Sequence, residues 1–326
     1  MSFPFNIYFG ALLCAAVTSA LAFPFWKRWC EWSGHLDDPG HRKIHSAAVP
    51  LAGGLTVMSG FFGPMLAGGV LLYAWNNPLL DATLRELLQY GLSKRALQVG
   101  AILLGAFGMV LLGWWDDRYE LSPLPKFAGQ ILFALLVAWS GIRITLFVPS
   151  EIVNYFLTIL WILALTNAFN FLDNMNGLCS GLGIIASWSC AWAAALQGQY
   201  LVALLGFFPF NFPHAQAFLG DAGSHLVGFL ISILAILPNF YSRKAAHPIA
   251  VLAPLLLLAL PLYDLVTVVW IRWKLRRPFW LGDNNHISHR LVRRGFTRTH
   301  AVLLILLAQA AACAAAISFL ARAARP

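Results

Sequence analysis

Residues 97–120 read LQVGAILLGAFGMVLLGWWDDRYE, an apolar run that stops on two adjacent aspartates, Asp116 and Asp117. A helix of about 20 apolar residues crosses the roughly 30 Å hydrocarbon core of a bilayer. Two neighbouring carboxylates repel each other and cost free energy close to a membrane. The stretch therefore predicts a membrane-spanning helix whose end holds a carboxylate pair for a chemical purpose.

Apolar runs of this kind recur along the whole chain. Of its 326 residues, 60% are hydrophobic and only 11% are charged, whereas soluble proteins have about 25% charged residues. A membrane β-barrel is disfavoured, because its segments are about ten residues long and alternate polar with apolar. We therefore predict an all-α polytopic bundle of about ten membrane helices, with eleven as the alternative, forming one domain over residues 1–326. The predicted apolar segments are 5–26, 50–75, 97–115, 127–146, 153–170, 178–197, 200–211, 223–238, 248–271 and 301–320.

The distribution of basic residues predicts the orientation. Of the 22 Lys and Arg, 14 fall in one alternating set of loops, which the positive-inside rule places in the cytoplasm. The formal charge of +9 is thus spread along a membrane face rather than over a nucleic-acid-binding surface. The first apolar run lacks a basic start and is interpreted as a retained helix rather than a signal peptide. The expected location is the inner (plasma) membrane, with several spans and active-site loops in the cytoplasm.

Carboxylates gather on the same predicted face. Nine of the 13 Asp and Glu lie in the cytoplasmic set of loops. Acidic residues contribute little to topology, so orientation does not account for this clustering. A divalent cation that binds a phosphorylated substrate does account for it, and Mg²⁺ is the expected ion, with Mn²⁺ as an alternative.

The loop after the opening stretch adds basic and amide side chains. In GWWDDRYELSPLPKFAGQ (113–130), Lys126 and Gln130 begin the next helix, one turn apart on one face. Paired carboxylates there bind Mg²⁺ or supply a general base to a phosphate or hydroxyl acceptor. The alternative is an acidic pair solvated by headgroup water.

Two further motifs place polar groups at helix ends. In TNAFNFLDNMNGLCSG (166–181), Asn167, Asn170 and Asp173 recur every three residues, a spacing that predicts one shared face for base recognition or metal binding. The alternative is an ordinary polar helix terminus with a turn. In FLGDAGSHLVGF (218–229), Asp221 lies between glycines that allow close approach to a diphosphate, while an N-cap carboxylate is the alternative.

Two basic segments complete the set. The loop 272–300 contains eight Lys and Arg and three His, and its His286-x-x-His289 pair beside Arg290 fits diphosphate binding or proton transfer. The segment 37–54 carries Arg42, Lys43 and His45 close to the predicted membrane surface. For both segments the alternative is simple anchoring to anionic lipid.

With these motifs in this order, the chain resembles the polyprenyl-phosphate N-acetylhexosamine-1-phosphate transferase superfamily (glycosyltransferase family 4). The resemblance covers about residues 36–291. DDPGHRKIH…PLAGG is similar to the family's D-x-P-N-x-R-K-x-H…P-x-x-G-G segment, and DDRYELSPLPKFAGQ to its D-D-x-x-x-L-S-P-x-x-K-F-x-x-Q segment. NAFNFLD, FLGDAGS and the histidine loop follow. The resemblance includes undecaprenyl-phosphate GlcNAc-1-phosphate transferases and phospho-MurNAc-pentapeptide transferase.

The resemblance implies a reaction, namely transfer of N-acetylhexosamine 1-phosphate from a UDP-sugar to polyprenyl phosphate with release of UMP. This is the first membrane step of a cell-envelope glycan pathway. Direct attack is the preferred mechanism, and a covalent aspartyl intermediate is the alternative. A GlcNAc-type donor is favoured, because the loop lacks the three consecutive histidines of the peptidoglycan enzyme. The implied partners are the UDP-sugar, the lipid phosphate, membrane lipid and, more weakly, a second copy of the chain.

The resemblance also implies roles for individual residues. The implied catalytic residues are carboxylates and histidines, and Asp116 is implied to act as a general base or to orient the lipid phosphate. The implied metal ligand is Asp221, together with Asp117 and Asn170. The implied catalytic set is Asp116, Asp117, Asp173, His286 and His289, and the implied substrate-binding set is Arg42, Lys43, His45, Lys126, Gln130, Asn167, Asn170, Asn176 and Arg290.

The chain departs from the family pattern at several positions. Asn174 and Asn176 stand in DNMNG where D-G-x-D-G is common, and Ser288 stands where many members have His. Gly40 and Ala48 replace Asn and Pro. Two other functions stay open, an intramembrane prenyltransferase that uses Mg-diphosphate and a non-catalytic lipid-binding or transport protein. The first needs a second aspartate-rich motif, and the second needs polar residues at mid-span, where only Asp264 lies.

Overall fold

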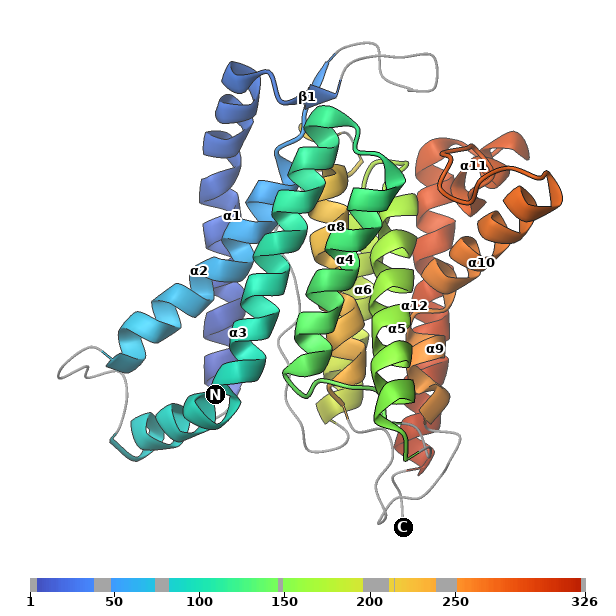
Figure 1. Cartoon of the computed structure of the whole chain (residues 1–326). Helices are drawn as coiled ribbons and strands as arrows, with labels where there is room; N and C mark the ends of the chain where they lie inside the picture. Colours follow the sequence, from blue (N-terminus) through green and yellow to red (C-terminus); the bar gives the residue numbers. More distant parts are fainter. Residues whose placement is uncertain are drawn as a thin grey trace.

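The computed structural model describes residues 5–37, 48–73, 82–145, 149–195, 211–213, 215–238 and 251–323. Over these residues the chain forms a helix bundle with one small two-stranded sheet (Figure 1). The helices are α1 (Phe5–Ser33), α2 (Gly53–Tyr73), α3 (Ala82–Tyr119), α4 (Pro123–Trp139), α5 (Glu151–Phe171), α6 (Leu178–Ala195), α8 (Gly220–Ile236), α9 (Ala253–Leu257), α10 (Ala259–Lys274), α11 (Ile287–Arg293) and α12 (Arg298–Ala323). The strands β1 (Leu36–Asp37) and β2 (Val49–Pro50) pair antiparallel.

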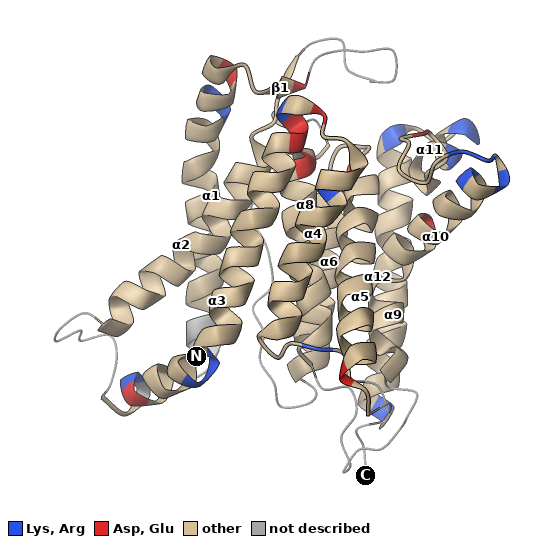
Figure 2. Cartoon of the chain, in the orientation of Figure 1, with Lys and Arg blue, Asp and Glu red and all other residues tan. Residues whose placement is uncertain are grey.

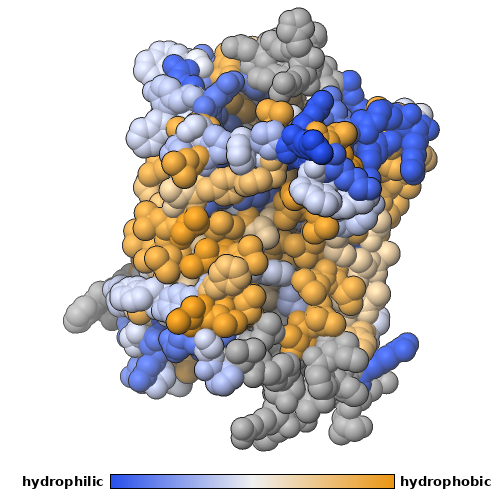
Figure 3. Space-filling view, turned by 45° about the vertical axis from the view of Figure 1, so that its right-hand side comes forward, coloured by the Kyte–Doolittle hydropathy of each residue, from blue (hydrophilic) through white to orange (hydrophobic). Residues whose placement is uncertain are grey.

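The bundle has the dimensions and surface of a membrane protein. Six helices in the described part of the chain are long and apolar enough to cross a bilayer, namely α1, α2, α3, α5, α6 and α12. The apolar helices α4 and α8 are shorter. An apolar belt separates two polar ends of the molecule in Figure 3. The all-α membrane class is thereby confirmed, while the predicted seventh segment (200–211) falls almost wholly outside the described residues.

The helices run up and down, so alternate connections meet at one end. The C-terminal ends of α1, α3, α5 and α10 and the N-terminal ends of α2, α4, α6, α8 and α12 lie at the top in Figure 1. Figure 2 shows most of the acidic residues and the basic α10–α11 region at this same end. The Arg143–Glu151 ion pair lies at the opposite end. The polar motifs in the described part of the chain thus gather at one end of the bundle, as predicted.

Helix α8 is the centre of the bundle. Most of its residues are small or apolar, which favours burial on all sides, and 14 of its 17 residues are buried. It packs against α2, α3, α5 and α6. Glycines let the neighbours come close, since a Cβ on Gly113 of α3 would lie 2.4 Å from the backbone N of Ala222. A Cβ on Gly54 of α2 would lie 2.5 Å from the N of Gly223.

The starts of α2 and α8 are tied to each other. The first N–H groups of a helix lack partners within it. Gly53 N donates to Phe218 O at 2.9 Å, and Gly54 N donates to Leu219 O at 3.0 Å. In return, Phe218 N donates to Pro50 O at 3.0 Å. These backbone bonds hold the two helix starts side by side at the polar end.

Two helices differ from the predicted segments. Helix α3 begins at Ala82, well before residue 97, because polar residues end a membrane segment without ending a helix. The predicted segment 248–271 is broken between α9 and α10. Pro261 has no N–H to donate to the carbonyl of Leu257, and Gln309 of α12 donates Nε2 to that carbonyl at 2.7 Å. Gln309 also accepts a hydrogen bond from Leu260 N at 3.0 Å. The buried side-chain amide of Gln309 therefore supplies partners for backbone groups on both sides of the break.

Replacing Gly113 with Ala tests the close packing of α3 on α8. The added methyl group would meet the backbone of Asp221 and Ala222, which cannot rotate away. We expect a loss of about 1–3 kcal/mol of stability, seen as a lower melting temperature in detergent. The matched control is Gly100→Ala in the same helix, where no atom lies within 4 Å of the new Cβ. Equal melting temperatures for the two variants would contradict this packing.

Candidate active site

The carboxylates of Asp116 and Asp221 meet around a single ammonium group. Lys126, in the first turn of α4, forms an ion pair with Asp116 at the end of α3. Its Nζ also lies 2.9 Å from Asp221 Oδ2 at the start of α8. Asp116 and Lys126 are 8% and 18% exposed, while Asp221 is 32% exposed. A cation therefore bridges two acids at a site that solvent still reaches through Asp221.

Asn170 adds an amide to this cluster from the last turn of α5. Its Nδ2 donates to Asp221 Oδ1 at 2.7 Å and to the buried hydroxyl of Ser224 at 3.0 Å. Both oxygens of Asp221 thus have partners, one cationic and one neutral. Ser224, which follows Asp221 by almost one helical turn, completes the cluster, and the pattern of small residues around it gave no sign of this contact.

Asp117 performs a different task from its neighbour. Its Oδ1 accepts from the backbone N of Asp221 at 2.8 Å, and its Oδ2 accepts from Ala222 N at 3.1 Å. A carboxylate at a helix N-terminus satisfies unpaired N–H groups and favours the helix dipole. Gly220 lies in the left-handed region (φ +69°), and a Cβ there would lie 2.8 Å from Asp117 Oδ2. The glycines of FLGDAGS therefore serve protein contacts, with Gly223 meeting Leu219 and Gly54.

Asp173 lies in the turn between α5 and α6, next to this cluster. Burial, followed by the negative charge of Asp221, raises the pKa of Asp173 from 3.8 to about 8. A backbone hydrogen bond from Gly220 opposes these effects without cancelling them. At neutral pH this carboxyl group is therefore mostly protonated in the folded chain, and it presents a hydrogen-bond donor as well as acceptors.

The three-residue spacing of the 166–181 motif does not produce a single face. Asn167 donates Nδ2 to Gln130 Oε1 of α4 at 2.7 Å, whereas Asn170 faces α8. Three residues turn a helix by about 300°, so each step moves the side chain by about 60° around the axis. Gln130 is fully buried. The Gln130–Asn167 pair joins α4 to α5 beneath Lys126, and only Asn170 reaches Asp221.

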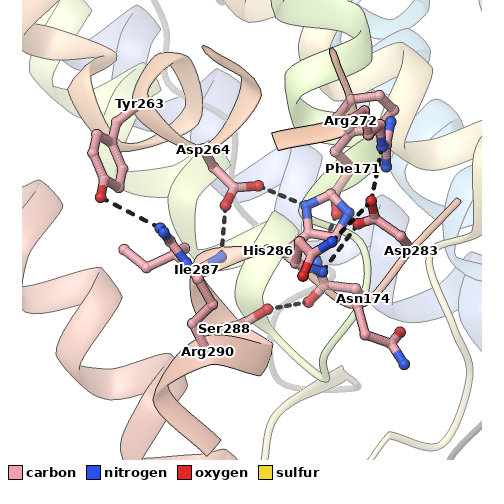
Figure 4. A network of polar contacts seen from close by, with 12 residues as sticks. Phe171, Asn174, Tyr263, Asp264, Arg272, Asp283, His286, Ile287, Ser288 and Arg290 are labelled. Atoms are coloured by element: carbon pink, nitrogen blue, oxygen red, sulfur yellow. Dashed lines mark hydrogen bonds and ion pairs between the residues drawn. The ribbon is translucent and has the colours of Figure 1, made fainter. Parts of the chain in front are cut away.

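A second polar cluster forms around His286 (Figure 4). Asp264, fully buried in α10, approaches His286 Nδ1 through its Oδ2 at 2.7 Å. Its Oδ1 accepts from the backbone N of Ile287 at 2.6 Å. The ring of His289 lies 6.4 Å from that of His286. Burial, followed by the charges of His286 and Arg293, lowers the pKa of His289, which keeps that ring largely neutral.

The last turn of α5 connects the two clusters. Asn170 bonds to Asp221, and the next residue, Phe171, places its ring 5.5 Å from His286 in an edge arrangement. On its face lies the guanidinium of Arg272, 4.7 Å from the ring centroid. Arg272 also donates Nε to Asp283 at 3.1 Å and Nη1 to the carbonyl of Phe279. These contacts fold the loop between α10 and α11 onto the site.

A further contact ties α11 to the turn that holds Asp173. Ser288, fully buried, donates its hydroxyl to Asn174 Oδ1 at 2.6 Å. Asn174 in turn donates Nδ2 to the carbonyl of Phe171 at 2.6 Å. Two of the positions at which the chain departs from the family pattern are therefore bonded to each other.

The remaining predicted residues lie at the edges or beyond. Arg290 donates to the hydroxyl of Tyr263 at 3.3 Å, on the outer side of α10. Asn176 donates weakly to Pro213 O at 3.4 Å rather than joining the acidic cluster. Arg42, Lys43 and His45 fall outside the described residues. Sequence reasoning left the partner of Asp264 open and missed Arg272 with Asp283. A lone carboxylate in an apolar segment is nevertheless a general sign of function or pairing.

The acidic cluster fits a magnesium ion held mainly by substrate and water. In the described part of the chain, no three His, Cys, Asp or Glu side chains converge on one metal position. Mg²⁺ commonly takes only one or two carboxylates and completes its shell with water and phosphate oxygens. Asp221 and Asp116 provide such a pair, and the ammonium of Lys126 already occupies the cationic position between them. Asp117 has one lone pair left on each oxygen, since both accept backbone N–H groups.

Comparisons with known proteins agree with this arrangement. Residues 99–239, which carry the acidic cluster, match the model of glycosyl transferase family 4. The chain is 29% identical to a probable undecaprenyl-phosphate N-acetylglucosaminyl 1-phosphate transferase of Bacillus subtilis, covering 91% of this chain and 80% of the relative. It is 30% identical to a decaprenyl-phosphate N-acetylglucosaminephosphotransferase of Mycobacterium leprae, covering 82% and 73%. An undecaprenyl-phosphate alpha-N-acetylglucosaminyl 1-phosphate transferase of Escherichia coli O157:H7 is 28% identical over 85% and 74%.

The raised pKa of Asp173 predicts a pH-dependent stability. Folding takes up a proton at this residue between pH about 4 and about 8, so the free energy of unfolding falls as pH rises through that window. Asp173→Asn removes this dependence. The melting temperature of the wild type relative to the variant should therefore fall between pH 5 and pH 8.5, measured in detergent with EDTA.

The control for this measurement is Asp283→Asn. The hydrogen bond from Arg272 helps to lower the pKa of Asp283, although burial opposes it. The group is thus ionised throughout the window in both folded and unfolded chains, and its removal should shift the melting temperature by a constant amount. Parallel curves for the wild type and Asp173→Asn would show that Asp173 is ionised in the folded protein.

Proposed function

Because the chain belongs to glycosyl transferase family 4, we propose that it transfers a sugar phosphate to a lipid phosphate. The donor is a UDP-N-acetylhexosamine, with UDP-GlcNAc favoured, and the acceptor is a polyprenyl phosphate such as undecaprenyl phosphate. The products are UMP and the lipid-linked diphosphate sugar. This is the first membrane step of a cell-envelope glycan. The relatives' names, which specify N-acetylglucosamine and undecaprenyl or decaprenyl phosphate, support this choice.

The observation that carries the proposal is the Asp116–Lys126–Asp221 cluster, completed by Asn170. It lies at the polar end of the bundle, where apolar helices end. A lipid phosphate has its charged group at this depth and its chain in the hydrocarbon. A soluble nucleotide sugar reaches the same depth from water. The cluster is thus placed where both substrates can meet.

In the proposed reaction, an oxygen of the lipid phosphate attacks the β-phosphorus of the nucleotide sugar. The bond from that phosphorus to the bridging oxygen breaks, and its electron pair leaves with UMP. A phosphate monoester has a second pKa of about 6, so most of the lipid phosphate is already fully deprotonated at neutral pH. We assign to Asp116 the orientation of this phosphate rather than proton removal, and to Lys126 the neutralisation of its charge. No covalent enzyme intermediate is needed.

Mg²⁺, when bound, neutralises charge on the diphosphate and on the departing UMP. Asp221, the most exposed carboxylate of the cluster, is the proposed ligand, with Asp116 beside it. Asn170 positions Asp221 through its amide. Mn²⁺ has similar ligand preferences and is an alternative. We place this end of the bundle in the cytoplasm of a cell with the protein in its inner membrane, which the loop charges support.

The test is UMP release by the purified protein in detergent, given undecaprenyl phosphate, Mg²⁺ and each of several UDP-sugars. We expect release with UDP-GlcNAc that requires both lipid and metal. Asp221→Asn should lower kcat by roughly 100-fold or more, because it removes a charge at the diphosphate.

The matched control is Glu151→Gln, the same kind of change at the opposite end of the bundle. It should leave turnover within about twofold of the wild type, since surface ion pairs contribute little. No UMP from any donor, in protein that melts cooperatively, would overturn the proposed function. Full activity of Asp221→Asn would overturn the site.

A further inference from the structure

We propose that Asp264 is a positioning residue that fixes the orientation and tautomer of His286 for the transfer reaction. The inference rests on the proposed function, since it concerns how His286 meets the diphosphate. It is carried by the buried contact between α10 and the start of α11, which is independent of the acidic cluster (Figure 4).

Asp264 lies in an apolar helix and has no exposed surface. A buried carboxylate is expensive unless its oxygens are engaged. Each oxygen has one partner from the loop, His286 Nδ1 at 2.7 Å and Ile287 N at 2.6 Å. Asp264 therefore holds both the ring and the backbone from which α11 begins.

His286 is the N-cap residue of α11 with extended backbone (φ −61°, ψ 152°) and is only 4% exposed. Phe171 lies against its edge at 5.5 Å. A carboxylate can only accept, so Nδ1 must carry the proton. The other nitrogen, Nε2, faces away from Asp264 by the geometry of imidazole (Figure 4). One nitrogen thus points to the carboxylate and the other points away from it.

When the bond to the bridging oxygen breaks, negative charge develops on the phosphate of UMP. An imidazolium Nε2–H can donate a hydrogen bond to that phosphate, and a carboxylate behind the ring stabilises the imidazolium. Asp264 touches neither substrate nor reacting atoms in this arrangement, so its effect passes through His286.

The positioning role of Asp264 is distinct from simple folding of the loop. The loop has other attachments, namely the Arg272–Asp283 ion pair and the Ser288–Asn174 hydrogen bond. In Asp264→Asn, the side-chain oxygen can still accept from Ile287 N. The amide then donates to Nδ1 and favours the opposite tautomer. The variant therefore changes the ring's proton while it keeps the shape of the contact.

The test compares Asp264→Asn with Asp283→Asn, a loop carboxylate that faces Arg272 rather than His286. We expect Asp264→Asn to lower kcat by about 100-fold, with KM for both substrates within about threefold of the wild type. Asp283→Asn should have a much smaller effect on kcat. The double variant Asp264→Asn/His286→Gln should have the kcat of His286→Gln alone, because the two residues act as a unit.

The pH profile is the readout that a structural role would not move. Removal of the negative charge beside the ring should shift the pH dependence of kcat to lower pH. The titratable groups that face the ring are Asp264 from α10 and His289 from α11, with Arg272 and Asp283 beyond Phe171. Asp283→Asn should leave the profile in place.

A measurement without turnover distinguishes failure of this proposal from failure of the proposed function. In the full chain with ¹⁵N-labelled histidine, the signal lost in His286→Gln should report an Nδ1-protonated ring. Asp264→Asn should change that signal. An unchanged signal, or wild-type kcat and pH profile in Asp264→Asn, would overturn the positioning role. Inactivity of the wild type with every donor, with the tautomer as expected, would overturn only the transfer reaction.

Discussion

The carboxylate of Asp117 at the N-terminus of α8 is the contact on which the rest of the site depends. It joins the end of one membrane helix to the start of another, far along the chain, through the N–H groups of Asp221 and Ala222. Helix starts have N–H groups without partners in the helix, and here they lie in the packed contact between α3 and α8. The carboxylate of Asp117 in α3 accepts hydrogen bonds from these N–H groups and thereby fixes the position of Asp221.

The position of Asp221 then determines the electrostatics of the cluster. Its side chain is brought to the ammonium of Lys126, which also pairs with Asp116. The two adjacent aspartates thus have different roles. Asp117 accepts hydrogen bonds from the backbone N–H groups of α8, and Asp116 pairs with the ammonium group of Lys126. Their mutual repulsion is offset by a helix dipole for one and an ammonium group for the other. Glycine at position 113 makes this approach sterically possible.

Sequence reasoning reached the helical class, the common polar end and the residues of the acidic cluster. Those follow from apolar length and from loop alternation, which are properties of single segments. It did not predict which side chains contact each other. Asn167 and Asn170 look equivalent in the sequence, yet only Asn170 meets Asp221, because each step of three residues rotates around the helix. Asp264 looked isolated, because its partner, His286, lies in a loop whose folding depends on tertiary contacts.

Two of the departures from the family pattern, Asn174 and Ser288, can be explained only from the three-dimensional structure. Taken singly, Asn174 and Ser288 look like weakened versions of a binding motif. In the fold, the hydroxyl of Ser288 donates to the amide of Asn174, and that amide donates to the end of α5. A small hydroxyl at the buried position leaves room for the larger side chain opposite. The two changes are thus consistent with one exchange across an interface, and they tie the histidine loop to the turn of Asp173 rather than loosening it.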